Sequence, residues 1–299
     1  MNSSSESPGA RFRRALGTGT IAIPGVFNAL VARMAERAGF PAVYQSGAAL
    51  SAGLAAIPDV GLLTQSEFVE QGRYLAQAVS IPVISDADTG FGEALSVERT
   101  VRLYEAAGLA GLHLEDQQLP KRCGHLSGKS LVRTEEMTAK IRAAVAGRID
   151  PDFVLIARTD ARASEGLEAA LERARAYVEA GADLIFPEAL QSREEFARFA
   201  EEISVPLIAN MTEFGKSPLL TVDELAELGY RAVLFPVTIF RVAMRAAERA
   251  LNELAATGTQ QSLLPQMQTR AELYELLGYT GYEERDRAYF GEPPASPSA

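Results

Sequence analysis

Short apolar runs alternate with longer segments of helical spacing along almost the whole chain, and this alternation limits the possible folds more than any other feature. Because none of these runs is polar enough to leave one face in water, they are predicted to form a parallel sheet that helices cover. Eight strand–helix repeats favour an α/β fold of the closed (β/α)8 TIM-barrel type, with a doubly wound open sheet as the alternative. The eight runs are Ile21 to Val26, Ala42 to Ser46, Ile81 to Asp88, Gly111 to Asp116, Phe153 to Asp160, Ala182 to Glu188, Val205 to Asn210 and Ala232 to Pro236.

The sequence also predicts helix starts and the domain organisation. A capping-box pattern, in which a hydroxyl and a carboxylate bind the free amides of a first turn, occurs at Thr64 and Glu67, Ser192 and Glu195, and Thr221 and Glu224. No compositional break separates the repeats, so residues 1–299 are predicted to form a single domain. We expect an N-terminal helical segment at about 8–17, further helices from Ile239 onward, and a disordered Pro- and Ser-rich tail at about 292–299.

The charge balance and the lack of long apolar segments argue against several classes of function. The chain has 29 Lys and Arg against 39 Asp and Glu, and its net charge of −10 opposes binding to nucleic acid or to an anionic membrane. No run of about 18 apolar residues occurs, so no membrane span is predicted. The single cysteine, Cys123, can form no intrachain disulfide, which suits the reducing cytoplasm. An anionic small-molecule substrate would need a local cluster of positive charge.

Polar residues follow nearly every apolar run. In a (β/α)8 barrel the carboxyl ends of the strands meet on one face, which is where such enzymes place their active sites. We therefore expect these polar residues to form one site. They are Asn28, Ser46, Asp86, Asp88, Glu115, Asp116, Arg158, Asp160, Glu188, Asn210 and Thr212.

Four acidic residues near these strand ends are candidate metal ligands. Asp86 and Asp88 stand two residues apart and point the same way if the chain is still extended there. Glu115 comes from the next strand, and Asp59 lies in the segment Pro58-Asp59-Val60-Gly61. Oxygen-only ligands of this kind suit Mg²⁺ better than zinc. The alternative is that the two aspartates only cap the next helix.

The candidate catalytic loop is Lys121-Arg122-Cys123-Gly124-His125. Neighbouring positive charge lowers the pKa of a thiol, so Cys123 can transfer protons near neutral pH. The alternative is a cysteine packed as a small apolar side chain. Of the two histidines, His125 is the better catalytic candidate because it lies on this loop, whereas His113 lies within a strand run.

Three arginines are candidates for binding substrate carboxylates. Arg158 interrupts an apolar run and is costly to bury without a partner. Arg241 and Arg270 belong to the later helical segments, where an exposed helix face is a strong alternative explanation for each.

Many motifs, in order and over about Arg11 to Tyr289, resemble the isocitrate lyase and phosphoenolpyruvate mutase superfamily, and within it the 2-methylisocitrate lyase family. The matching segments are Tyr44 to Gly47, Pro58 to Gly61, Asp86 to Gly92, His113 to Gln117, Lys121 to His125, Ala157 to Ala161, Phe186 to Ala189, Asn210 to Gly215 and Met267 to Arg270. One departure is Ala48, where the commoner lyase pattern has glycine, and another is Gln45, where that pattern has an apolar residue.

The resemblance implies a homotetramer in which the eighth helix is exchanged between subunits. It also implies cleavage of the tricarboxylate 2-methylisocitrate to pyruvate and succinate, in the methylcitrate route of propionate breakdown. By the same resemblance, Asp86 and Asp88 hold Mg²⁺ with Asp59 and Glu115 completing its shell. The residues expected to line the substrate are Ser46, Gly47, Ala48, Cys123, Gly124, Arg158, Glu188, Asn210, Met211, Thr212, Arg241 and Arg270.

The expected reaction of this oxo-acid lyase is a retro-aldol-type cleavage in which Cys123 protonates the departing carbanion. Lys121 and His125 are expected to assist on the same loop. Tyr44 is the first candidate for the base that deprotonates the substrate hydroxyl, and a hydroxide held by the metal is the second. Isocitrate, 2,3-dimethylmalate and oxaloacetate are alternative substrates, and a noncatalytic dicarboxylate-binding protein is the alternative of another class.

Overall fold

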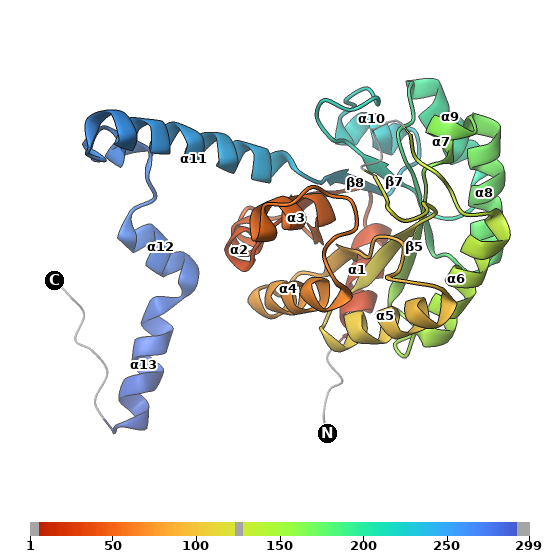
Figure 1. The fold of residues 1–299 in the computed structure, drawn as a ribbon. Coiled ribbons are helices and arrows are strands. Elements are labelled where there is room, and N and C mark those ends of the chain that lie inside the picture. The colour runs from red at the N-terminus through yellow and green to blue at the C-terminus, as the bar shows by residue number, and fades with distance from the viewer. Residues whose placement is uncertain (1–5, 123–127, 292–299) are drawn as a thin grey trace. The chain divides into compact units, whose positions relative to one another are not determined.

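Eight parallel strands form the centre of the unit that ends at Arg241 (Figure 1). The computed structural model describes residues 6–122 and 128–291. The strand order is β6-β5-β4-β3-β2-β1-β8-β7, and a parallel bridge between Ile185 and Leu207 joins β6 to β7. The predicted (β/α)8 barrel is therefore confirmed. The strands are β1 (Ile21–Val26), β2 (Val43–Gln45), β3 (Val83–Asp86), β4 (Gly111–Glu115), β5 (Val154–Thr159), β6 (Leu184–Pro187), β7 (Ile208–Asn210) and β8 (Ala232–Phe235).

Helices surround these strands on the outside (Figure 1). Full capping boxes open α4 at Thr64 and α10 at Thr221, as the sequence predicted. At α9 the prediction is only half right. Ser192 accepts the N–H of Glu195, but the Glu195 carboxylate binds Arg162 and the N–H of Gln191 instead of closing the box. The helices are α1 (Pro8–Gly17), α2 (Ala29–Arg37), α3 (Gly47–Ala55), α4 (Gln65–Ala78), α5 (Ala94–Ala106), α6 (Thr134–Gly147), α7 (Ala161–Ser164), α8 (Leu167–Glu179), α9 (Arg193–Glu202) and α10 (Val222–Glu227).

Two apolar layers hold the barrel together because successive side chains of a strand point to opposite faces. In β5, Val154 and Ile156 belong to the inner layer, whereas Leu155 and Ala157 belong to the outer layer between strands and helices. The same alternation continues past the apolar residues. Arg158, two positions after Ile156, therefore lies on the inner side, at the carboxyl end of the barrel.

Helix α1 packs against the amino end of the barrel. Phe12, which is completely buried, belongs to the inner layer together with residues at the starts of strands such as Ile21 and Val154. Arg13 donates a hydrogen bond of 2.9 Å to the carbonyl of Asp152, just before β5. Helix α1 therefore lies at the amino end of the barrel, opposite the carboxyl end where Arg158 lies.

The residues from Val242 onward form a second compact unit, separate from Met1–Arg241. Its elements are α11 (Thr238–Thr257), which begins in the first unit, the 3-10 helix η1 (Gln261–Gln266), α12 (Arg270–Leu277) and α13 (Tyr279–Tyr289). A full capping box at Thr269 opens α12, and Gly278, in the left-handed conformation, ends it. None of the helices within 6–122 and 128–291 is long and apolar enough to cross a membrane. The predicted disordered tail at 292–299 lies outside the described residues.

Candidate active site

A pocket lies at the carboxyl end of the barrel and brings together residues from almost every strand end. Four of its polar residues, Asp86, Arg158, Glu188 and Asn210, each follow by two positions an inner apolar residue of β3, β5, β6 or β7, so the alternation along the strand directs them to the barrel interior. The residues that line the pocket are Tyr44, Ser46, Ala48, Asp59, Asp86, Lys121, Arg122, Arg158, Phe186, Glu188, Asn210, Thr212, Leu234, Pro236, Val237 and Arg241.

The two aspartates after β3 lie together, although the chain between them is not extended. Strand β3 ends at Asp86, and Asp88 takes a left-handed backbone conformation with φ of 45°. Its N–H donates a 2.8 Å hydrogen bond to Oδ1 of Asp86. A tight turn, and not the expected continuation of the strand, therefore brings the two carboxylates close. Burial, followed by the charges of Asp86 and Asp59, raises the pKa of Asp88 to about 7 even though Lys121 opposes the rise.

Lys121 lies among the acidic residues. Its ammonium forms ion pairs with Asp59 and with Asp88, the latter at 2.6 Å, and its side chain is 3% exposed. Burial alone would lower the pKa of Lys121, but the carboxylates of Glu115, Asp88, Asp86 and Asp59 raise it well above its ordinary value. Lys121 therefore carries a positive charge inside the acidic cluster.

Glu115 fits a cation site. Its side chain is 1% exposed, and among the described residues neither carboxylate oxygen has a hydrogen-bond partner, although Nη1 of Arg158 lies 3.3 Å from Oε2. Leaving both oxygens of a buried carboxylate without hydrogen bonds is costly unless a cation compensates for them. Gly47 leaves space for Asp86, because a Cβ at that position would clash with Oδ2 of Asp86.

The acidic residues do not form a closed cage of direct ligands. In the described part of the chain, no three His, Cys, Asp or Glu side chains lie close enough together to hold a metal ion. Mg²⁺ commonly keeps several waters and uses only one or two protein carboxylates directly. An open set of carboxylates with unpaired oxygens therefore suits Mg²⁺ better than a metal that needs four protein ligands.

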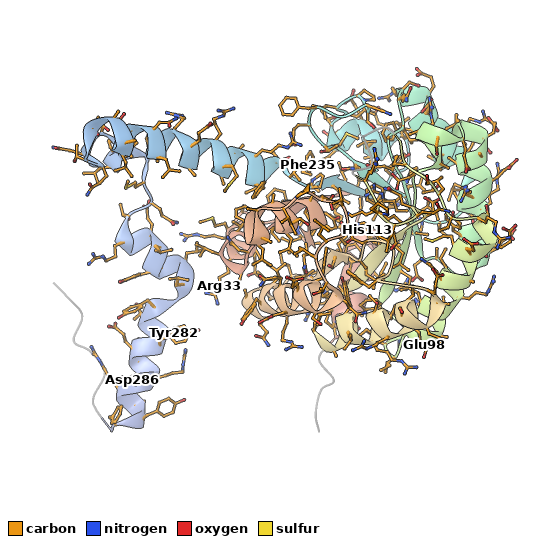
Figure 2. All side chains as sticks on the ribbon, viewed as in Figure 1. Arg33, Glu98, His113, Phe235, Tyr282 and Asp286 are labelled. Carbon is orange, nitrogen blue, oxygen red and sulfur yellow. The ribbon has the colours of Figure 1, made fainter. Side chains whose placement is uncertain are left out.

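Tyr44 and His113 form a buried pair beneath the acidic residues. The Tyr44 hydroxyl lies 2.8 Å from Nε2 of His113 and 3.4 Å from Oδ2 of Asp86. Figure 2 shows His113 among the side chains of the barrel. Burial raises the pKa of Tyr44 well above its ordinary value and lowers that of His113 to about 4. Near neutral pH, Tyr44 therefore keeps its proton and His113 is uncharged.

Arg158 is a buried cation that lines the pocket. Its guanidinium binds Asp160 with two hydrogen bonds of 3.0 and 3.2 Å, and Nη2 lies 3.7 Å from Oε1 of Glu188. The guanidinium carbon lies 5.3 Å from the centre of the Phe186 ring. The sequence-based expectation that Arg158 needs buried partners is therefore met.

Other predicted substrate residues lie in or beside the pocket. Ser46 also caps α3 by accepting the N–H of Ala49, and the Asn210 amide donates to Glu188 at 3.1 Å. Met211 differs, because its side chain packs in the outer apolar layer and its sulfur accepts the N–H of Leu220. Only the backbone of Met211 can therefore face the pocket.

Four predicted residues cannot be placed in the pocket. Cys123, Gly124 and His125 lie outside the described residues. Arg270 is the first residue of α12, in the second compact unit. Arg241, the last residue of the first unit, does line the pocket and lies 3.6 Å from Glu213.

Sequence reasoning missed several residues of this site. His113 was ranked below His125 as a catalytic candidate. It precedes Glu115 by two positions on the same face of β4, and this spacing indicates that both side chains point into the barrel. Phe186 holds the corresponding position before Glu188 in β6. Gln117 was noted only as the end of the matching segment His113 to Gln117; its contribution comes from a side-chain amide that makes two hydrogen bonds, of 2.8 and 2.9 Å, with the backbone of Arg122.

Known proteins of similar sequence cover nearly the whole chain. A 2-methylisocitrate lyase of Aeropyrum pernix is 54% identical over 282 residues, which are 94% of this chain and 91% of that protein. A 2-methylisocitrate lyase of Escherichia coli is 48% identical over 281 residues, covering 93% of this chain and 95% of the relative.

Solved structures give the same picture of the fold. A 2,3-dimethylmalate lyase has a TM-score of 0.89 at 35% identity, and an oxaloacetate acetylhydrolase with 3,3-difluorooxalacetate has 0.91 at 37%; each comparison covers 97% of this chain and 99% of the other. A phosphonopyruvate hydrolase complexed with oxalate and Mg²⁺ has a TM-score of 0.83 at 36% identity, covering 94% of this chain and 97% of the other. The family model for phosphoenolpyruvate phosphomutase matches residues 12–255, and this chain therefore belongs to the phosphoenolpyruvate mutase family.

Proposed function

We propose that this protein is a magnesium-dependent lyase that cleaves 2-methylisocitrate to pyruvate and succinate. The observation that carries the proposal is that one pocket is lined both by carboxylates, including Asp59 and Asp86, and by the guanidinium groups of Arg158 and Arg241. A substrate that has a hydroxyl beside one carboxylate, for a metal ion held by the acidic residues, and further carboxylates for the arginines matches this lining. Relatives that are 54% and 48% identical to this chain carry the same activity in their names.

The acidic residues fit the magnesium ion. Asp86 and Asp88 would hold it, directly or through water, with Asp59 and Glu115 completing the shell. Bound there, Mg²⁺ supplies Lewis-acid polarisation of the substrate hydroxyl and its neighbouring carboxylate. Lys121 already neutralises part of this acidic cluster, so its ammonium and the cation share the same carboxylates.

The reaction breaks the bond between C2 and C3 of the substrate. The C2 hydroxyl loses a proton and becomes the keto oxygen of pyruvate, while the bonding electrons move to C3 and produce the succinate carbanion. Tyr44 is the first candidate to accept this proton: its hydroxyl lies 2.8 Å from Nε2 of the neutral His113, so the tyrosine would pass its own proton to His113 as it takes the one from the substrate. Arg158 and Arg241 stabilise the charge on the departing succinate. Cys123 returns one proton to C3, so the proton count balances.

The remaining features of the proposal rest on family likeness and on composition. We place the protein in the cytoplasm as a homotetramer that exchanges its eighth helix between subunits, acting in the methylcitrate cycle of propionate catabolism. The net charge of −10 and the single cysteine agree with this location.

Related substrates are the competing possibility. The solved relatives include a 2,3-dimethylmalate lyase and an oxaloacetate acetylhydrolase. In this chain Ala48 lines the pocket, at a position where the commoner lyase pattern has glycine. An added methyl group changes the space for a substrate substituent, so it bears on substrate choice and not on the reaction type.

The test supplies 2-methylisocitrate, isocitrate, 2,3-dimethylmalate and oxaloacetate separately with Mg²⁺ and identifies the products of each. The proposal expects pyruvate and succinate in equal amounts from 2-methylisocitrate, and no product after EDTA. Faster cleavage of any of the other three acids would overturn the choice of substrate. If the protein converts none of the four acids, it is better described as a dicarboxylate-binding protein.

A further inference from the structure

Asp160 connects the arginine of the pocket to a lysine that does not line it. The Asp160 carboxylate is completely buried and accepts two hydrogen bonds from Arg158. Its Oδ1 also accepts a 2.7 Å hydrogen bond from Nζ of Lys129, whose side chain is 1% exposed. Neither Asp160 nor Lys129 is among the residues that line the pocket. Any effect of Asp160 or Lys129 on the pocket therefore passes through Arg158.

Asp160 is itself held firmly in place. Its backbone N–H donates a 2.9 Å hydrogen bond to Oδ1 of Asp116. The other oxygen of Asp116 accepts hydrogen bonds from Thr159 and from Tyr177, both at 2.8 Å. Because the whole arrangement is buried and fully hydrogen-bonded at Asp116, the position of the Asp160 carboxylate is defined by the fold.

This arrangement fixes one edge of the Arg158 guanidinium. Nε and Nη2 are bound by Asp160, and Nη1 is left facing Glu115, at 3.3 Å from Oε2. Two parallel hydrogen bonds to one carboxylate restrict rotation of a guanidinium far more than a single bond does. The remaining edge of Arg158 is therefore presented to the pocket in one orientation.

The charges around Arg158 explain why a second cation is needed. Three carboxylates, those of Glu115, Asp160 and Glu188, lie within 4 Å of the one guanidinium. Without another cation near Asp160, the carboxylate of Asp160 would largely neutralise the charge of Arg158. The guanidinium would then attract a substrate anion only weakly. Lys129 supplies that cation to Asp160 from a buried position, where screening by water is small.

We propose that Asp160 is a positioning residue that orients Arg158 toward a substrate carboxylate, and that Lys129 balances the charge of Asp160 so that Arg158 can attract that carboxylate. The inference deepens the proposed function and rests on it. It predicts that two residues outside the pocket control the affinity for the anionic substrate, while the chemical step depends on them less.

The test is a double-mutant cycle with Lys129→Met, Asp160→Asn and the double variant. Each protein is measured for KM and kcat with 2-methylisocitrate and Mg²⁺, for the dissociation constant of succinate by calorimetry, and for Tm. Arg162→Met is the matched control. Arg162 lies two residues after Asp160 in the chain and forms an equally close ion pair with Glu195 through two hydrogen bonds, which the substitution removes. The control should lower Tm and leave KM unchanged.

Lys129→Met is expected to raise KM and the succinate dissociation constant about tenfold, with a smaller change in kcat. In the double variant the two effects should be less than multiplicative, because Asp160→Asn removes the excess negative charge that Lys129→Met leaves behind. Lys129→Arg, which keeps the charge, should restore most of the affinity. Lys129→Gln replaces Lys129→Met if the latter does not fold.

An unchanged KM and succinate affinity in folded Lys129 variants would overturn the inference, as would multiplicative effects in the double variant. A rise in KM that is matched by proportional falls in kcat and Tm would instead indicate a merely structural role and would also overturn it. If the wild type binds succinate but does not cleave 2-methylisocitrate, the proposed function fails, while the succinate measurements still decide the role of Asp160 and Lys129.

Discussion

The ammonium nitrogen of Lys121 lies 2.6 Å from Oδ1 of Asp88, and the same nitrogen also pairs with Asp59. Two carboxylates that we assign to magnesium are therefore already partly neutralised by a lysine of the same chain. A cation that approaches these carboxylates meets the positive charge of Lys121 at short range, where the dielectric constant is low.

Replacing Lys121 with methionine is expected to tighten Mg²⁺ binding by about tenfold, because the repulsion between the ammonium and the cation disappears. Turnover should fall at the same time. Isothermal titration calorimetry of Mg²⁺ at constant ionic strength measures the affinity. Arg102→Met, which removes a charge of the same sign from the exposed surface of α5, is the control. Weaker Mg²⁺ binding in Lys121→Met would contradict the assigned ion site.

Replacing Tyr44 with phenylalanine is expected to lower kcat by about a hundredfold, because the hydroxyl next to His113 and Asp86 is lost from proton transfer. The ring remains, so the barrel should keep its fold. Tyr230→Phe is the matched control: Tyr230 is another buried tyrosine, and in the described part of the chain its hydroxyl donates to the carbonyl of Phe196. Equal kcat values for the two variants would exclude Tyr44 from the reaction.

The ion pair between Arg162 and Glu195 predicts a dependence of stability on pH. Burial raises the pKa of Glu195, but the hydrogen bonds from Arg162 and Gln191 outweigh it and hold the pKa below its ordinary value of 4.5. The ion pair therefore stabilises the folded protein fully above about pH 4.5, the ordinary pKa of a glutamate. This stabilisation is lost as the pH falls through the lower pKa that Glu195 has in the folded state. Glu195→Gln should destabilise the protein by about 1–2 kcal/mol at pH 7.

Urea unfolding of the wild type and of Glu195→Gln at a series of pH values measures this effect. The difference in unfolding free energy should shrink as the pH falls below 4.5, because protonation then removes the charge of the wild-type carboxylate and makes it neutral like the glutamine. A difference that stays constant over the acidic range would show that the ionised pair is not its source.

Ala56, which ends α3, takes a left-handed conformation with φ of 54° that is unfavourable for a residue with a Cβ. Ala56→Gly should therefore stabilise the protein by about 0.5–1 kcal/mol, after the greater entropy of glycine in the unfolded chain is counted. Ala55→Gly, one position earlier and inside the helix, should destabilise it by about the same amount. Thermal unfolding of both variants checks the prediction, and shifts of the same sign would contradict it.

The barrel could be predicted from the sequence because its signal is repeated. Each apolar run, such as Gly111 to Asp116, contains a strand whose limits differ from the run by only a few residues. The polar residues of the site could be predicted for the same reason, since Arg158 and Glu188 each follow the inner apolar positions of their strands at a spacing of two.

Features that depend on three-dimensional contacts could not be predicted. The left-handed turn at Asp88 is formed through a hydrogen bond to the Asp86 side chain, whereas the sequence alone favoured an extended pair. The capping role of Glu195 is lost because Arg162, distant in sequence, competes for its carboxylate. The connection from Asp160 to Lys129 likewise joins residues that no local pattern relates.

The most direct test of the central claim gives the enzyme equal concentrations of 2-methylisocitrate and isocitrate in one reaction with Mg²⁺. The initial ratio of pyruvate to glyoxylate then equals the ratio of kcat/KM for the two acids. We expect pyruvate to form in large excess, with succinate equal to the sum of pyruvate and glyoxylate. Glyoxylate in excess, or no cleavage of either acid, would contradict it.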